Sequence, residues 1–537
     1  MKVKQNHIAK PNSSSRHWFP LLLPVLVFTI VVAQSVAWAA LSENIYMEGT
    51  ARVRPLPLIK IDTPTHPENY NFSIFRGETD FTPNDMQARL IATDPEDGDI
   101  TSSIYIEECK KGGQVVTCPT AWLDWEYGDY TITYRATNSQ GLLSLPLIIN
   151  IEIWQFINIQ NGTFHGIALT SHGQAWSWGW NSDGQRGIGA PYSNMQNHRA
   201  PTLIPQSDFG GLPVTDVAAA HHTSCAINIA GAAYCWGLGS SGERGDGTTI
   251  GIALSPVAVI MPQGITFQQI SGPKGTNTSG SFGALGSDGN VYTWGSGAGR
   301  GLGTGNSYSH TTPVRITNTG DIVYVWQGNH GGAAVTDTGQ VYVWGRNNRG
   351  QLGRGDTAEN DANSLPGLVP GLSGVSRVSY GGYGGNGGHV LALKTNGEVW
   401  GWGWAYGVNG QNNNQTTPLQ VANISNARFV NAGADFSHFV VGNDVYGIGY
   451  SDAGEIFGGN NTSKATPTIS PMENIAGNVG TTTGGYNNAY IMDKNGVTLW
   501  GVGYSDAAGQ QFGSTEVQNS SVSVAIPWTF TAAVVEW

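Results

Sequence analysis

The sequence contains a group of acidic side chains whose spacing suits metal binding. Asp94, Glu96, Asp97 and Asp99 lie close together, and carboxylate oxygens at such spacing can hold Ca²⁺. The same residues are typical of an acidic turn, here one that contains Gly98, and they lack the terminal Glu that an EF-hand loop requires. A calcium site and a turn are therefore both open interpretations. No other cofactor is indicated.

Glu243 and Asp246 are a second group of neighbouring acidic residues. Glycoside hydrolysis uses two carboxyl groups, and these two residues can act as its general acid and base. Many other loop acids would serve equally well. No Ser or Cys lies in a nucleophile elbow, and the chain has no phosphate-cradling Lys motif. A non-catalytic binding protein is therefore the leading hypothesis, and an extracellular enzyme that acts on polysaccharide is the alternative.

The four cysteines fall into two close pairs, Cys109 with Cys118 and Cys225 with Cys235. Each pair spans a predicted hairpin, where facing positions on adjacent strands reach disulfide distance. Even, locally paired cysteines in an exported chain indicate disulfides. The alternatives are free thiols or a zinc site, but zinc needs converging ligands and no short Cys/His spacing is present.

Residues 1–39 have the features of a signal peptide. Basic residues come first, an apolar run covers Phe19 to Val32, and Ala37-Trp38-Ala39 forms a small-residue cleavage site. The run is shorter than a membrane-spanning helix needs, which favours cleavage over an uncleaved anchor. We expect an exported protein in the periplasm, at the cell surface or in the medium, with no membrane span after cleavage. Residues 40–54 read as a linker.

The charge of the chain argues against nucleic-acid partners. Without residues 1–39, 22 basic and 38 acidic residues leave a net charge of −16. Such a surface repels phosphate backbones. Only 12% of all residues are charged, while 75 are Gly and 18 are Trp. This composition is typical of many short strands joined by tight turns, so we expect an all-β protein.

Residues 55–154 contain short alternating or apolar segments typical of a β-sandwich. The clearest are 58–61, 88–92, 130–134 and 147–153. Residues 92–101 and 128–141 together resemble the bacterial immunoglobulin-like domains first described in pesticidal crystal proteins. The resemblance implies a spacer or adhesive module rather than a catalyst.

Residues 155–537 repeat one unit, in which an apolar strand and a Gly-containing turn lead to a second strand that ends in an aromatic residue and Gly. The closing glycines are Gly179, Gly237, Gly295, Gly345, Gly403, Gly449 and Gly503, spaced by 46 to 58 residues. A repeat of this length is typical of a propeller blade, and seven copies suit a closed ring. We therefore predict a seven-bladed β-propeller preceded by an immunoglobulin-like β-sandwich.

The repeat resembles that of the regulator-of-chromosome-condensation family. Residues 344–353, Trp-Gly-Arg-Asn-Asn-Arg-Gly-Gln-Leu-Gly, are close to its signature, and residues 178–185 follow it less fully. His165 and His389 occupy the family's His position before a blade strand. In this family a strand from one terminus commonly completes a blade with the other terminus.

The resemblance makes Phe156–Ile159 and Ala532–Val535 the candidate closing strands. The eukaryotic namesake promotes nucleotide exchange on a nuclear GTPase. A signal peptide and disulfides contradict a nuclear location, so we do not expect this activity here. The family also includes secreted bacterial propellers, among them a β-lactamase inhibitor that binds its target enzyme. We therefore expect a bacterial, monomeric binding protein whose partner is a protein or a carbohydrate.

The aromatic residues of the repeat divide into two groups. A tryptophan that recurs at one position of the repeat is expected in the core; these are Trp178, Trp236, Trp294, Trp344 and Trp402, while blades six and seven have Ile448 and Val502 there. The position after the closing Gly also accepts Ser and Arg, so aromatic residues there suggest a contact surface over blades five, six, seven and one. The candidate partner-binding residues are Trp180, Trp404, Tyr406, Tyr450 and Tyr504. The alternative is that they cover strand ends.

Overall fold

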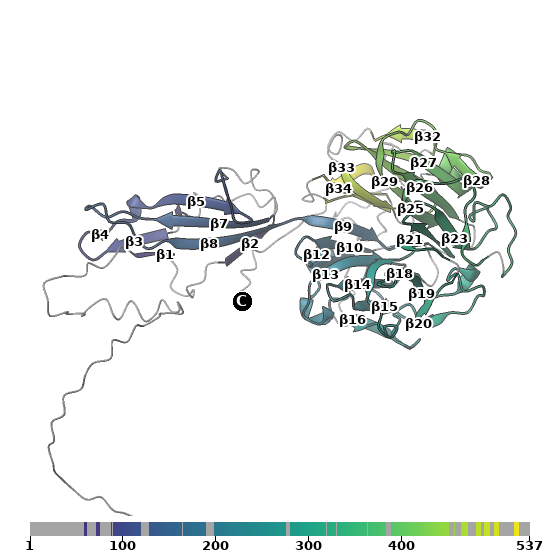
Figure 1. The fold of residues 1–537 in the computed structure, drawn as a ribbon, viewed down its shortest axis with the longest axis horizontal. Coiled ribbons are helices and arrows are strands. Elements are labelled where there is room, and N and C mark those ends of the chain that lie inside the picture. The colour runs from purple at the N-terminus through teal and green to yellow at the C-terminus, as the bar shows by residue number, and fades with distance from the viewer. Residues whose placement is uncertain are drawn as a thin grey trace, which may run out of the picture.

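The computed structural model describes residues 58–61, 71–75, 87–88, 90–119, 128–163, 165–189, 198–274, 280–317, 319–328, 330–361, 364–382, 388–450, 456, 463–470, 479–484, 488–494, 499–503 and 520–525. These residues form nine β-sheets, of which seven have four strands each. Figure 1 shows the N-terminal sheets beside a ring of the four-stranded sheets. The short helical segments are η1 (Thr101–Ser103), η4 (Gln206–Phe209), η5 (Ala298–Arg300) and α3 (Tyr406–Asn409). The all-β prediction is confirmed.

The N-terminal part consists of two sheets around one core. The smaller sheet contains β1 (Leu58–Ile61), β3 (Leu90–Asp94) and β4 (Gly98–Asp99). The larger sheet has the order β2 (Asn71–Phe75), β8 (Leu147–Trp154), β7 (Gly128–Arg135), β5 (Tyr105–Lys111) and β6 (Gln114–Val116). Ala92 of the smaller sheet belongs to the same buried cluster as Ile132 and Ile149 of the larger one. Alternate residues of β7 are buried, which is the period-two pattern of a half-buried strand.

Each four-stranded sheet uses four successive strands of the chain. Blade one contains β9 (Phe156–Asn161), β10 (His165–Thr170), β11 (Ala175–Gly179) and β12 (His198–Leu203). Blade two contains β13 (Val214–Ala219), β14 (Thr223–Asn228), β15 (Ala233–Leu238) and β16 (Ile252–Ala258). Blade three contains β17 (Phe267–Ser271), β18 (Ser281–Gly286), β19 (Val291–Gly295) and β20 (His310–Arg315). Blade four contains β21 (Ile322–Gly328), β22 (Gly331–Thr336), β23 (Val341–Gly345) and β24 (Gly367–Leu368).

The last three blades follow the same order. Blade five contains β25 (Val375–Gly382), β26 (Gly388–Lys394), β27 (Val399–Trp404) and β28 (Asn414–Gln420). Blade six contains β29 (Ala427–Ala432), β30 (Phe436–Val441), β31 (Asp444–Gly449) and β32 (Lys464–Ile469). Blade seven contains β33 (Val479–Gly484), β34 (Asn488–Asp493), β35 (Leu499–Gly503) and β36 (Ser520–Ala525). The predicted closing glycines all lie at or next to the end of a third strand.

The ring closes by packing between blades one and seven. The first strand of each blade contacts the first strand of the next, and β33 and β34 both contact β9. The expectation that Phe156–Ile159 completes the last blade is wrong, because this segment lies in β9 and pairs with β10 of its own blade. Residues 532–535, the other candidate closing strand, lie outside the described residues. Blade seven already has four strands of its own.

The repeated tryptophans are core residues, as predicted. All five are fully buried. The indole Nε1 of Trp236 donates to the carbonyl of Gln185 at 2.9 Å, and that of Trp402 donates to the carbonyl of Gln351 at 2.8 Å. In both cases the acceptor lies in a loop of the preceding blade. Trp294 and Trp344 donate to loop carbonyls of the preceding blade in the same way. These four tryptophans therefore fill the space between two blades and also fasten them by a buried hydrogen bond.

The Gly after each tryptophan is required by the backbone. Gly237 has φ +97° and Gly403 has φ +100°, a region that L-residues rarely adopt. A Cβ atom on Gly403 would also lie only 2.5 Å from the carbonyl oxygen of Gly388 on the neighbouring strand. Geometry thus imposes the Trp-Gly repeat, which marks the fold and not the activity.

Two buried histidines also fasten loops of neighbouring blades by hydrogen bonds. The Nε2 atom of His165 lies 2.8 Å from Ser224 Oγ, and that of His389 lies 2.8 Å from Ser437 Oγ. Each serine hydroxyl in turn donates to a loop carbonyl, that of Gln185 for Ser224 and that of Gly407 for Ser437. Both imidazoles are fully buried, so these histidines are structural.

Both predicted disulfides are present. Cys109 of β5 is bonded to Cys118. Cys225 of β14 and Cys235 of β15 face each other across the strand pair and are bonded as well.

Candidate functional site

The loop face of the propeller carries the predicted contact residues. In each blade the chain alternates direction, so the loop after the first strand and the loop after the third strand emerge on one side. Trp404 ends β27 of blade five, and Tyr450 follows β31 of blade six. Both positions come after a third strand, so both lie on this face.

Three of the five candidate residues meet at the junction of blades five and six. The ring centroids of Trp404 and Tyr406 are 5.8 Å apart, and those of Tyr406 and Tyr450 are 6.0 Å apart at an angle of 66°. Tyr406 begins the short helix α3, which packs against β30 and β31 of blade six. Tyr450 is 42% exposed, and the other two rings are half-buried. We call Trp404, Tyr406 and Tyr450 the aromatic cluster.

Arg349 of blade four extends this cluster. Its guanidinium carbon lies 3.8 Å from the centre of the Trp404 ring, which is a cation–π contact. Its Nη1 atom lies 3.4 Å from Asn414 Oδ1, and its backbone N–H donates to Gln351 Oε1 at 2.8 Å. Arg349 was not among the candidates, although it lies in the signature at 344–353. That segment was interpreted only as evidence for the fold.

Asp435 brings a carboxylate to the same junction. It lies in the loop between β29 and β30, and its carbonyl accepts a hydrogen bond from the backbone N–H of Tyr450 at 3.0 Å. Burial raises the pKa of Asp435 to about 6, and the charge of Arg349 opposes this rise. The loop therefore fixes Tyr450 through its backbone and places an ionisable group near Arg349. No sequence pattern indicated Asp435.

The structure does not place the remaining two candidates in this cluster. Trp180 follows β11 of blade one, and its indole Nε1 donates to Ser182 Oγ. Ser182 Oγ donates to Asp183 Oδ2 at 2.7 Å, and His222 Nδ1 lies 2.9 Å from the same carboxylate oxygen. Trp180 thus lies beside a polar network between blades one and two. Tyr504 lies outside the described residues.

The acid–base pair proposed for an enzyme is occupied by local contacts. Asp246 Oδ2 accepts from Arg244 Nε at 2.8 Å, and Thr248 donates to its other oxygen. Burial acts to raise the pKa of Asp246, but these hydrogen bonds outweigh it and lower the pKa. Glu243 is 1% exposed, burial raises the pKa of its carboxyl group, and a backbone N–H of Ser241 donates to it. These contacts hold the loop of blade two.

The acidic group of the N-terminal part forms a hydrogen-bonded turn. Asp94 Oδ1 accepts from the backbone N–H groups of Glu96 and Asp97, at 2.8 and 3.0 Å. Asp97 accepts from Ser139, and Asp99 accepts from the backbone N–H of Thr101. Within the described residues, no group of three or more His, Cys, Asp or Glu side chains is arranged to hold a metal ion. The contacts favour the turn interpretation of this cluster.

Among the residues with described structure, no helix is long and apolar enough to cross a membrane.

Known proteins resemble more than half of the chain. The ultraviolet-B receptor UVR8 of Arabidopsis thaliana is 27% identical over 325 residues, which are 59% of this chain and 70% of the receptor. The human E3 ubiquitin-protein ligase HERC2 is 29% identical over 315 residues, which are 56% of this chain but only 6% of HERC2.

Solved structures share the fold. Human WBSCR16 has a TM-score of 0.55 at 18% identity, with 66% of this chain and 94% of that one covered. Prp20p of Saccharomyces cerevisiae has a TM-score of 0.53 at 21% identity, with coverage of 66% and 84%. Residues 137–479 match the RCC1-like domain. Because this match covers more than half of the 537 residues, the chain belongs to the RCC1-like domain family of β-propellers.

Proposed function

We propose that this protein is a non-catalytic binding protein that holds a protein partner on its loop face, at the aromatic cluster and Arg349. The observation that carries the proposal is the grouping of Trp404, Tyr406 and Tyr450 across two blades, with Arg349 stacked on Trp404 from a third blade. Trp, Tyr and Arg are the residues most enriched among binding hot spots. Packing of the blades does not require them here, because other blades have Leu, Ser or Arg at the position of Trp404.

The rigidity of the support favours the same proposal. The aromatic cluster lies on loops that Trp402, His389 and Ser437 fasten to the strands by buried hydrogen bonds. Loops held in this way lose little conformational entropy on binding. Among proteins with this fold, Prp20p is described as binding Gsp1p and histones, and yeast RCC1 has been solved bound to Kap60. A protein partner is therefore favoured over a carbohydrate.

The proposal includes export of the chain. Residues 1–39 have the pattern of a signal peptide. Two disulfides suit an oxidising compartment. We further propose that the two-sheet N-terminal part is an immunoglobulin-like spacer, as its resemblance to surface domains implies, and that it carries the propeller away from its point of attachment.

The test is capture of a partner from the native envelope or medium by the immobilised protein. Trp404→Ala combined with Tyr450→Ala should weaken capture at least about 30-fold, which corresponds to about 2 kcal/mol at a hot spot. Tyr308→Ala is the matched control, because Tyr308 is an exposed aromatic residue (74%) on a loop of blade three. Both variants should keep the thermal unfolding transition of the parent protein. Equal capture by all three proteins would refute the assigned surface.

A further inference from the structure

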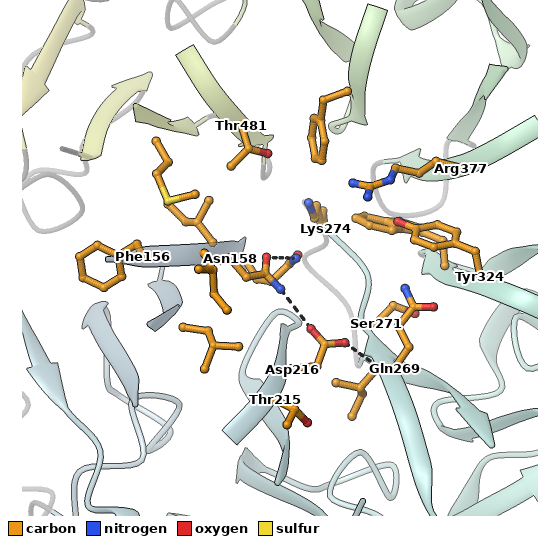
Figure 2. A pocket seen from close by; sticks show the side chains of 18 of the residues that line it. Phe156, Asn158, Thr215, Asp216, Gln269, Ser271, Lys274, Tyr324, Arg377 and Thr481 are labelled. Atoms are coloured by element: carbon orange, nitrogen blue, oxygen red, sulfur yellow. Dashed lines mark hydrogen bonds between the residues drawn. The ribbon is translucent and has the colours of Figure 1, made fainter. Parts of the chain in front are cut away.

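The axis of the propeller contains a cavity of about 670 Å³ that the first strands of all seven blades line (Figure 2). The third residue of each of these strands faces it. These seven residues form one layer of the wall: Asn158, Asp216, Gln269, Tyr324, Arg377, Phe429 and Thr481. The volume lies within the range of small-molecule binding sites. The wall combines aromatic rings with a few polar groups, which is the usual composition of such sites.

Lys274 reaches across this cavity. It follows β17 of blade three and is 2% exposed. Its Nζ atom donates to Asn431 Oδ1 of blade six at 2.9 Å and to Thr483 Oγ1 of blade seven at 2.6 Å. The ammonium also lies 4.5 Å from the centre of the Trp326 ring of blade four. Four blades thus meet at one buried positive charge.

A second cation, Arg377 of β25, faces the same space. Its guanidinium carbon lies 5.4 Å from the centre of the Tyr324 ring and 5.1 Å from that of Phe429. Among the described residues, neither Arg377 nor Lys274 forms an ion pair with a carboxylate. Burial, together with the charge of Arg377, lowers the pKa of Lys274 to about 7. The two cations therefore destabilise each other in a space that water screens poorly.

Asp216 does not compensate this charge. Its carboxylate accepts from the backbone N–H groups of Ile270 and Val217, both at 2.9 Å, and from Asn158 Nδ2 at 3.0 Å. Burial raises its pKa to about 6. Figure 2 shows Asp216 and Asn158 on one side of Lys274, and Arg377 and Tyr324 on the other. The acidic side chain is thus used to join blades one, two and three.

The remaining charged residues of the cavity wall are Arg428, Asp493 and Lys494. They add two positive charges and one negative charge. Together with Lys274, Arg377 and Asp216, they leave the wall with an excess of positive charge. Such an interior favours an anion over a neutral or cationic ligand.

We propose that this cavity is a binding site for a small organic carboxylate, with Lys274 and Arg377 as its anion-binding side chains. The planar guanidinium of Arg377 presents paired donors that match a carboxylate. The rings of Tyr324, Trp326 and Phe429 pack against an apolar, aromatic ligand body. The site is separate from the aromatic cluster on the loop face, so it does not depend on the proposed function.

Binding of this anion is coupled to protons. A carboxylate beside Lys274 favours the ammonium form and raises the pKa of this group above about 7. Binding above neutral pH therefore takes up a proton, and affinity falls as Lys274 loses its charge. From about pH 6.5 to about pH 8 we expect a loss of nearly tenfold in affinity. Ionisation of Asp216, whose pKa is about 6, acts in the same direction.

The experiment is isothermal titration calorimetry of the full chain with benzoate, in two buffers of different ionisation enthalpy. Benzoate should bind at millimolar concentration or below, with proton uptake at about pH 8. Arg377→Gln should weaken binding at least about tenfold, because it removes a charge-assisted bidentate contact. Arg315→Gln is the matched control, because Arg315 lies on the outer strand of blade three and contacts Asn290. Its affinity should equal that of the parent protein.

Two further arms separate the possible outcomes. Lys274→Met should abolish the proton uptake; if this variant does not fold, Arg377→Gln and the buffer dependence of the parent protein decide. Acetate should bind more weakly than benzoate, because it lacks the aromatic body. The proposal is overturned if benzoate gives no binding heat with the folded parent protein, if Arg377→Gln binds it equally well, or if inorganic phosphate binds and benzoate does not.

Discussion

Acidification should destabilise the propeller through His165 and His389. Each imidazole donates from Nε2 to a serine hydroxyl that itself donates onward. Each Nδ1 atom is buried and has no hydrogen-bond partner among the described residues. Protonation would therefore place a charge and an unpaired N–H group in the core. Burial lowers the pKa of both histidines to about 3, and nearby charges add to this effect for His165.

The sign and size of the effect follow from the two pKa values. Between the unfolded pKa of 6.5 and the folded pKa of about 3, the unfolded state binds one more proton per histidine. The free energy of unfolding is therefore highest above pH 6.5 and falls as the pH drops through this window. From pH 7 to pH 5 the loss is about 2 kcal/mol for each histidine, or about 4 kcal/mol for the pair.

Buried carboxyl groups oppose this trend. Burial raises the pKa of Asp216 and Asp435 to about 6. Between pH 6 and their ordinary value of 3.8, the folded state binds more protons at these groups, which stabilises it as the pH falls. The net slope of the parent protein is therefore smaller than the histidine contribution, and a variant comparison is needed to isolate it.

The assay is urea unfolding at pH 7 and pH 5 of the parent protein and of a variant with His165→Gln and His389→Gln. Glutamine keeps a donor for the serine but does not titrate. Between pH 7 and pH 5 the free energy of unfolding of the variant should fall by about 4 kcal/mol less than that of the parent protein. His172→Gln, in the turn between β10 and β11, is the control for the exchange of His for Gln. If parent and double variant lose the same free energy, the buried-imidazole argument is refuted.

Other contacts give sharper structural tests. Replacing Cys225 and Cys235 by Ser should lower the free energy of unfolding by about 3 kcal/mol, because a loop with a sequence separation of 10 is no longer closed; chemical denaturation measures this, and an unchanged midpoint would contradict it. Gly403→Ala should cost about 1–3 kcal/mol, because φ is +100° and Cβ would meet a carbonyl oxygen; a thermal melt reports it. Trp294→Phe should lower the free energy of unfolding by about 1–3 kcal/mol, because the carbonyl of Glu243 loses its buried donor. If the free energy of unfolding falls no more than it does for a Trp→Phe change at an exposed site, the hydrogen bond does not contribute.

The blade repeat could be predicted because packing imposes it locally. In blades one to five a Trp fills the space between two blades and the Gly after it adopts a positive φ, so the pair recurs at matched spacing. Blades six and seven keep the closing Gly but have Ile448 and Val502 in place of Trp. The disulfides were predictable for the same reason, since Cys225 and Cys235 face each other across one hairpin. The aromatic cluster was partly predictable, because Trp404 and Tyr450 depart from what the repeat demands.

The residues that sequence reasoning missed act between distant blades. Lys274 contacts Asn431 and Thr483, which are 157 and 209 residues away in the chain. No local pattern identifies such partners, because only closure of the ring brings them together. The expectation that Phe156–Ile159 completes the last blade was wrong for a related reason: this segment lies in β9 and pairs with β10, and the described part of the ring closes by packing of β33 and β34 on β9.

The join between the two parts of the chain has a mechanical consequence. A single residue, Gln155, separates β8 of the N-terminal sheet from β9, the innermost strand of blade one (Figure 1). Tension applied through the N-terminal part therefore enters the ring along β9. The hydrogen bonds between β9 and β10 are then loaded together in shear, since the force runs along the strand pair, instead of opening one after another. The propeller is thus attached through a strand whose hydrogen bonds to β10 share the load.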